Sequence, residues 1–164
     1  MREAIAAELE RIEESADHSA QSQFSSTKFW RFIHLALGCG TAVSAGLASA
    51  GALGDLAGQI AVGIAALVAT ALGSVLTALN PSQRSERAHV AANAYLSLRD
   101  RARVMRTVDL GELSGSESRA RFEALAEKRE AINAEAPVPA FLAYWFGRRN
   151  IQRGRTKHRV DEVG

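Results

Sequence analysis

The middle of this sequence has almost no charge. Between Phe32 and Gln83 the only charged residue is Asp55, although 23% of the 164 residues are charged. A long helix of a soluble protein normally keeps a charged stripe on its solvent side. The missing stripe argues against ordinary soluble helices here. All other formal charge lies outside this window, so an apolar middle is joined to two charged ends.

Residues for covalent or metal chemistry are also scarce. Cys39 is the only cysteine, so no disulfide can form within the chain. The four histidines are scattered along the sequence, at His18, His34, His89 and His158. We find no glycine-rich phosphate loop joined to a strand, no metal-ligand spacing and no nucleophile motif. We therefore expect no enzyme activity, and no cofactor, metal or nucleic acid as a ligand.

Each half of the apolar middle is long enough to cross a membrane. At about 1.5 Å per residue, segments 29–50 and 56–79 span roughly 33–36 Å, against a hydrocarbon core of about 30 Å. Gly51 and Gly54 permit a tight turn between them and place Asp55 at the headgroup level. The sequence predicts an all-α membrane protein in one domain. Its two-transmembrane helical hairpin has a cytoplasmic N-terminal helix, 1–27, and cytoplasmic C-terminal helices, 82–164.

Two other interpretations of the apolar middle were weighed. A buried hairpin in a soluble bundle is disfavoured because so short a chain cannot wrap both helices on all sides. The small residues Ala48 to Ala50 resemble a signal-peptidase site. However, the apolar segment before them is too long for a usual signal peptide, and a second span follows at once. We expect an uncleaved first span.

Basic residues predict the orientation of the hairpin. Lys28 and Arg31 flank the start of the first span, and Arg84 and Arg87 flank the end of the second. The turn between the spans has no lysine or arginine. By the positive-inside rule, both termini are expected in the cytoplasm, with Asp55 on the far side.

Small and polar residues recur on one face of each span. Their spacing of four and three residues keeps to one side of a helix. In the second span they are Gln59, Gly63, Ala66, Thr70, Gly73 and Thr77, and in the first span they are His34, Gly38, Thr41, Ala45 and Ala48. Branched residues lie on the opposite face, among them Val68 and Leu72, and suit contact with lipid.

Small faces suit close helix contact, and two spans offer few partners, so we expect a homo-oligomer in lipid. Either the stripes only pack the hairpin against itself, or copies line a polar path with Gln59, Thr70 and Thr77. His34, near the membrane boundary, is expected to be an interfacial residue.

The charged ends have helical patterns. Ile5, Leu9 and Ile12 give the N-terminal helix one apolar face, and Asn80 with Pro81 marks a break after the second span. An apolar stripe follows, formed by Ala88, Ala91, Tyr95, Leu98, Ala102 and Met105.

The last part of the chain also has helical signals. Ser114 and Glu117 have the spacing of a capping box, and the helix expected after them carries Phe122, Leu125 and Ile132. Pro137 and Pro139 are expected to open a last helix with an aromatic patch at Tyr144, Trp145 and Phe146. The basic residues of 148–159 suit either an anionic ligand or a solvated tail.

Two segments after the spans carry a family resemblance. They are SERAHVAANAYLSLRDRARVMRTVDL, with His89 and Tyr95, and RFEALAEKREAINAEAPVPAFLAYWFGRRNIQRG, with Pro137 and Pro139 before the final helix. Together with the hairpin they resemble the SLATT proteins, two-transmembrane effectors associated with SMODS-type nucleotidyltransferases and SLOG sensors. The resemblance covers most of the chain.

The resemblance implies an effector of a bacterial anti-phage or conflict system in the cytoplasmic membrane. Such a protein forms a pore or disrupts the membrane when a partner signals, often through a nucleotide second messenger. No sensor or nucleotidyltransferase is attached here, so the signal is expected from a separate partner. Two alternatives stay open: a membrane-anchored interaction module that never conducts, and a small housekeeping channel. The spans carry no acidic or basic side chain in their interior, which argues against coupled transport.

Overall fold

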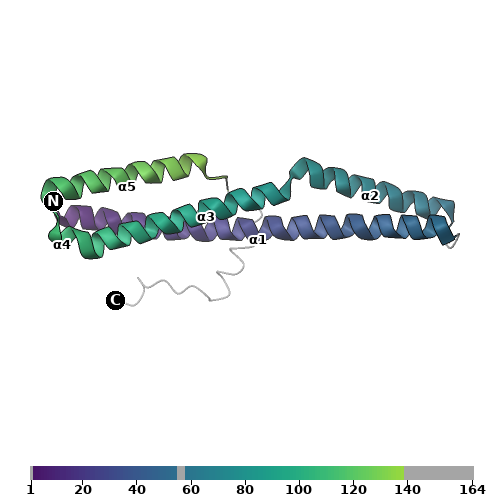
Figure 1. Ribbon diagram of the computed structural model, residues 1–164, viewed down its shortest axis with the longest axis horizontal. Coiled ribbons are helices and arrows are strands. Elements are labelled where there is room, and N and C mark those ends of the chain that lie inside the picture. Colours follow the sequence, from purple (N-terminus) through teal and green to yellow (C-terminus); the bar gives the residue numbers. More distant parts are fainter. Residues whose placement is uncertain (1, 55–57, 139–164) are drawn as a thin grey trace, which may run out of the picture. The chain divides into compact units, whose positions relative to one another are not determined.

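Every regular element in the part of the chain that the structure describes is a helix. The computed structural model describes residues 2–54 and 58–138. The helices are α1 (Arg2–Gly54), α2 (Gln59–Leu79), α3 (Pro81–Val104), a π-helical turn η1 (Met105–Asp109), the short α4 (Leu110–Glu112) and α5 (Gly115–Glu135), shown in Figure 1. The all-helical class is confirmed, and two of these helices are long and apolar enough to cross a membrane.

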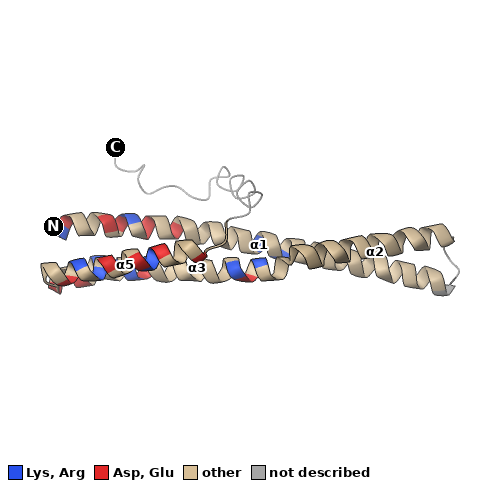
Figure 2. Ribbon diagram, turned by 90° about the horizontal axis from the view of Figure 1, so that it is seen from above, with Lys and Arg blue, Asp and Glu red and all other residues tan. Residues whose placement is uncertain are grey.

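The chain forms two compact units, which are described separately. The bundle unit consists of Met1–Thr27 with Glu86–Gly164, and the hairpin unit is Lys28–Ser85. Figure 2 shows that acidic and basic residues crowd the helices of the bundle unit and are nearly absent from those of the hairpin unit. Asp55, Pro139, the predicted last helix and its aromatic patch lie outside the described residues.

Helix α1 is longer than the sequence patterns suggested. The N-terminal helix and the first span were treated as separate segments, 1–27 and 29–50, but α1 continues through both for 53 residues. The first glycine of the chain is Gly38 and the first proline is Pro81, so nothing before the first span interrupts helical hydrogen bonding.

The predicted break after the second span is confirmed. Asn80 has left-handed backbone angles, with φ 43° and ψ 57°, and its N–H donates to the carbonyl of Leu76 at 3.1 Å. Asparagine tolerates this conformation better than most residues because its short polar side chain bonds locally. Pro81 then takes the first position of α3, where a missing N–H costs nothing.

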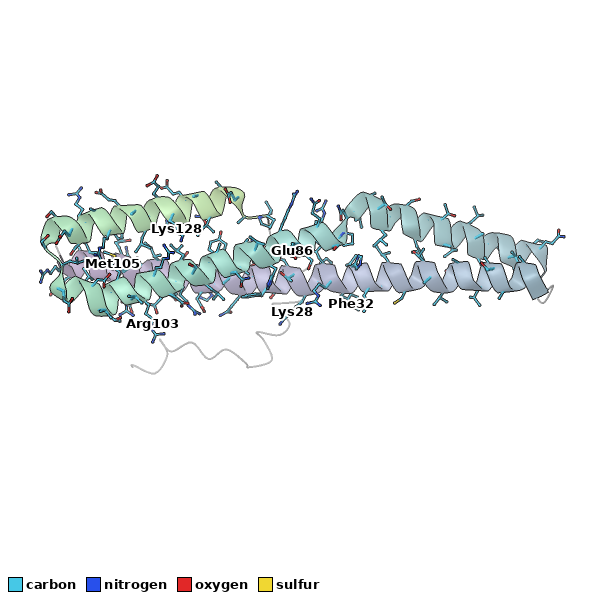
Figure 3. The ribbon with its side chains drawn as sticks, viewed as in Figure 1. Lys28, Phe32, Glu86, Arg103, Met105 and Lys128 are labelled. Carbon is cyan, nitrogen blue, oxygen red and sulfur yellow. The ribbon has the colours of Figure 1, made fainter. Side chains whose placement is uncertain are left out.

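The core of the bundle unit contains the residues that the sequence patterns selected. The stripe of α3 and η1 is buried at Ala88, Ala91, Tyr95, Leu98, Ala102 and Met105, and Leu9 and Ile12 of α1 are buried with it. Ile5, Phe122, Leu125 and Ile132 pack against this cluster and are partly buried. Figure 3 shows Met105 on the inner side of the bundle, whereas the labelled Arg103 projects away from it. Fully burying one leucine contributes about 1.5–3 kcal/mol, so the buried apolar residues of this cluster stabilise the unit.

The π-helical turn was not predicted. Residues five apart in an α-helix point about 140° away from each other, which would separate Met105 from Leu110. The wider turn of a π-helix brings them toward one side. Both are buried, at 3% and 8% exposure, and the Leu110 N–H donates to the Met105 carbonyl.

The predicted capping box at the start of α5 is confirmed. The N–H of Glu117 donates to the Ser114 hydroxyl oxygen at 3.3 Å, and the Ser114 N–H donates to the Glu117 carboxylate at 3.0 Å. These two bonds satisfy donors that a helix N-terminus otherwise leaves unpaired.

Candidate functional site

The contact between α1 and α2 defines the hairpin unit. Its half-buried residues recur every three or four positions in both helices. From α1 they are Ile33, Leu37, Gly40, Thr41, Ser44 and Ala48, and from α2 they are Val62, Ala65, Ala69, Leu72, Gly73 and Leu76. A Cβ atom on Gly40 would lie 3.1 Å from Cδ1 of Leu72, and one on Gly73 would lie 3.8 Å from Cγ2 of Thr41. Small residues on both sides therefore let the two helices approach closely.

One assignment from the sequence is wrong. Leu72 was placed on the lipid face of the second span, but it is half buried against Gly40 of α1. It lies three positions after Ala69 and four before Leu76, and so shares their contact face. The spacing of residues shows which ones share a face of the helix, but it does not show which face the other helix covers.

The predicted small and polar stripes divide between two environments. Thr41, Ala48 and Gly73 lie in the contact between α1 and α2, and Gly38 is half buried. The other members of the stripes are exposed: His34, Ala45, Gln59, Gly63, Ala66, Thr70 and Thr77. A Cβ on Gly38 or Gly63 would meet nothing within 4 Å. Packing of the hairpin against itself thus accounts for part of the stripes and leaves most of the remainder exposed.

The exposed members and the half-buried Gly38 form one surface, here called the small-residue face. It consists of His34, Gly38, Ala45, Gln59, Gly63, Ala66, Thr70 and Thr77. All except Gln59 come one position after a contact residue, and so lie about 100° further round their helix. Because α1 and α2 run in opposite directions, this common offset turns both stripes to the same side of the hairpin.

The hydroxyl groups of the hairpin bond to their own helices. Thr70, Ser74 and Thr77 donate to the carbonyls of Ala66, Thr70 and Gly73 at 2.8–2.9 Å. Such bonds remove most of the cost of placing a hydroxyl in an apolar medium. Gln59 is the exposed member of this face whose amide cannot be satisfied in that way.

The remaining surface of the hairpin unit is strongly apolar. Phe32 and Ile60 are 67% and 81% exposed, and Leu35, Val43, Leu47, Ile64, Leu67 and Val75 are exposed as well. The most apolar stretches of the two candidate spans have mean hydropathies of 1.4 and 2.2, and no part of either is buried in the fold. Exposed apolar surface on this scale is rare in soluble monomers.

The residues singled out by the family resemblance have packing roles in the bundle unit. The buried Tyr95 donates its hydroxyl to the Asn133 side chain at 2.8 Å, and burial raises its pKa. The exposed ring of His89 lies edge-on to Phe24, 6.0 Å between centroids. The carbonyl of Pro137 accepts from the Gln23 amide at 2.8 Å.

Sequence patterns missed Gln23. Its side chain is 3% exposed, and Oε1 has no hydrogen-bond partner among the described residues. The local sequence does not indicate that a glutamine in a polar stretch of helix is buried. Its hydrogen-bond partner, the Pro137 carbonyl, is more than a hundred residues away in the sequence.

Ion pairs connect the helices of the bundle unit. Arg99 bonds Asp17 at 2.7 Å and Arg106 bonds Glu13 at 3.0 Å, which joins α3 and η1 to α1. Arg121 of α5 bonds Asp109 at 2.8 Å. These groups are partly exposed, and pairs of this kind contribute about 0–1 kcal/mol each. They therefore orient the helices more than they stabilise them.

A groove of about 740 Å³ lies between α3 and α5. Leu96, Val104, Met105 and Leu125 contribute its apolar lining. Its charged lining is mixed, with the basic Arg101, Arg121 and Lys128 and the acidic Asp100 and Asp109. Among the described residues, no group of three or more histidine, cysteine or acidic side chains is placed to hold a metal ion.

No protein-family model, curated protein or solved structure matches this chain.

Proposed function

We propose that the hairpin unit crosses the bacterial cytoplasmic membrane twice, with both termini in the cytoplasm. Two observations support this: the length and hydropathy of the candidate spans, and the absence of buried residues from their most apolar stretches in the part of the chain that the structure describes. The basic residues before α1 enters the apolar segment and after α2 leaves it support the orientation.

We further propose that copies of the chain associate through the small-residue face. This surface is the observation that carries the proposal, because it is exposed on the single chain although its residues suit close helix contact. Gly63 supports it most directly, since a neighbouring helix can approach its backbone without meeting a side chain. The exposed branched residues of the hairpin, such as Val68 and Val75, then remain in contact with lipid.

The biochemical activity that we propose is permeabilisation of the membrane on a signal. Assembled copies surround a polar path to which Gln59, Thr70 and Thr77 contribute, and the bundle unit is the cytoplasmic part that receives the signal. The resemblance to the SLATT effectors supports a role in anti-phage defence or conflict. It also supports a nucleotidyltransferase or nucleotide sensor as the partner.

Ion flux from liposomes tests this activity. Purified full-length protein is reconstituted, and release of a trapped ion is followed with and without candidate cyclic nucleotides. We expect flux from the wild type that Gly63→Leu lowers strongly and Val68→Ala leaves unchanged. Flux that is absent under every condition, from protein shown to be inserted, would contradict the pore.

A non-conducting interaction module is the second candidate. It is favoured by the hydroxyl groups of Thr70 and Thr77, which already donate within α2 and so add little polarity to the face. On this account the small-residue face only joins helices, and Gly63→Leu dissociates an oligomer that conducts no ions.

A further inference from the structure

An aromatic and a basic side chain meet near one end of the hairpin unit. The guanidinium carbon of Arg84, in the first turn of α3, lies 5.0 Å from the centre of the Trp30 ring of α1. Nε of Arg84 donates to the Leu79 carbonyl at 2.9 Å, and Phe29 packs edge-on against Trp30 with 5.4 Å between ring centres. Arg84 is thus held by a cation–π contact and one hydrogen bond.

The rest of the Arg84 guanidinium is available for a ligand. Its two terminal nitrogens make no hydrogen bond or ion pair within residues 2–54 and 58–138. Lys28 and Arg31, in the same stretch of α1 as Trp30, are exposed and likewise form no ion pair in this part of the chain. We call Lys28, Trp30, Arg31 and Arg84 the basic collar.

The hairpin unit contains no acidic residue near the collar. Asp55 is its one carboxylate, and lies 24 residues after Arg31 and 29 before Arg84 in the sequence. The nearest carboxylate in the sequence is Glu86, two positions after Arg84 at the start of the bundle unit, and the basic Arg87 follows it directly. The positive charge of this stretch therefore exceeds its negative charge, and a group with a surplus of cations attracts anions from outside the chain. The collar also adjoins exposed apolar side chains, with Phe32 67% exposed and Leu79 37% exposed. A ligand that fits both surfaces has an anionic head and an apolar tail.

We propose that the basic collar binds the phosphate group of an anionic phospholipid in the cytoplasmic leaflet. Arg84 donates from its two terminal nitrogens to the phosphate oxygens, in the forked geometry that arginine offers and lysine does not. Trp30 holds the guanidinium in place at the membrane interface, where tryptophan is favoured. Lys28 and Arg31 add charge, and the acyl chains cover Phe32 and Leu79. The inference rests on the hairpin entering a membrane, and needs neither assembly nor conduction.

Quenching of tryptophan fluorescence by brominated lipids tests this proposal. The full chain carries Trp145→Phe, so that Trp30 is the only tryptophan. It is placed in mixed micelles with brominated phosphatidylglycerol or brominated phosphatidylcholine. We expect phosphatidylglycerol to quench at lower mole fraction. Each cation that faces an anionic surface adds roughly fivefold in affinity, so Arg84→Gln should weaken the preference by at least that factor.

Matched variants keep the result interpretable. Arg84→Lys retains the charge, loses the planar fork and should restore only part of the preference. Arg101→Gln removes an exposed cation that belongs to the bundle unit and should change nothing. Circular dichroism establishes that each variant remains helical.

Several outcomes would overturn the proposal. They are equal quenching by the two lipids, an unchanged preference in Arg84→Gln, and full competition by glycerol phosphate, which would mean that the collar recognises a free phosphate rather than a lipid. Inserted wild-type protein that prefers the anionic lipid but gives no ion flux under any condition would contradict the pore and leave the collar intact.

Discussion

Cδ1 of Leu72 lies 3.1 Å from the position that a Cβ on Gly40 would occupy. This pair shows why the glycines of the hairpin are not equivalent. At Gly40 the missing side chain admits a leucine of the other helix of the same hairpin. At Gly63 it leaves open surface, where an added Cβ would meet no described atom within 4 Å apart from its own stretch of helix.

The first prediction separates these two positions. Gly40→Leu should disturb the hairpin itself, because it requires Leu72 or the backbone to move, and should lower the amount of inserted protein. Gly63→Leu should leave insertion and the monomer unchanged but dissociate the oligomer. Cross-linking in membranes and measurement of the oligomer size in mild detergent distinguish the two variants. Intact oligomers of Gly63→Leu would rule out the small-residue face as the contact between copies.

The second prediction concerns orientation. In a chain that lacks Cys39, single cysteines are placed at the exposed positions Ala52, near the turn, and Ser116, in α5. An impermeant thiol reagent applied to intact cells with a permeable outer membrane should label the first and spare the second until the cells are lysed. The opposite result would refute cytoplasmic termini.

The third prediction concerns the stability of the bundle unit. Leu98→Ala removes a side chain with 0% exposure and should lower the free energy of unfolding by about 2–5 kcal/mol. Val104→Ala, at a 52% exposed position of the same helix, is the control and should cost far less. Chemical unfolding followed by circular dichroism in detergent measures both. Equal losses would mean that the cluster around Leu98 is not the core.

The fourth prediction follows from the capping box. Hydrogen bonds from the hydroxyl and then from the backbone N–H of Ser114 lower the pKa of Glu117. A carboxyl group with a lowered pKa in the folded state stabilises the fold above its unfolded pKa, which for glutamate is about 4.3. That stabilisation is lost as the pH falls through the folded pKa.

The difference in stability between wild type and Glu117→Gln should therefore be largest near neutral pH and shrink below about pH 4. Glu123→Gln, in a solvent-exposed pair with Arg119, is the matched control. A difference that stays constant with pH would show that the Glu117 charge contributes nothing to the cap.

Local patterns predicted the elements of the bundle unit well. Spacing selected the buried residues from Ala88 to Met105, and residue chemistry located the turn at Asn80 and the cap at Ser114. Each of these depends on neighbours within a few positions. The π-helical turn and the burial of Gln23 depend on contacts between distant segments, and no local sequence pattern predicts them.

The candidate site was only half predictable. Periodicity found the small and polar residues of both spans, but the rotation of one helix against the other decides which are covered. That rotation placed Thr41, Leu72 and Gly73 in the contact, and left Gly63 and Thr70 outside it. One helix cannot reveal where its partner lies, because a stripe of small residues fits a neighbour within the hairpin and a neighbour from another copy equally well.

The most direct test of the pore is the ion preference of a charged variant of the small-residue face. A lysine in contact with lipid costs roughly 2.5–3.5 kcal/mol on insertion, whereas one that lines a wet path costs much less. Thr70→Lys should insert and shift the reversal potential of reconstituted protein from cation toward anion preference. Val68→Lys, about 200° away on α2 and 44% exposed, is the lipid-facing control and should insert poorly. If Thr70→Lys fails to accumulate, or conducts with unchanged ion preference, the face packs helices and lines no path.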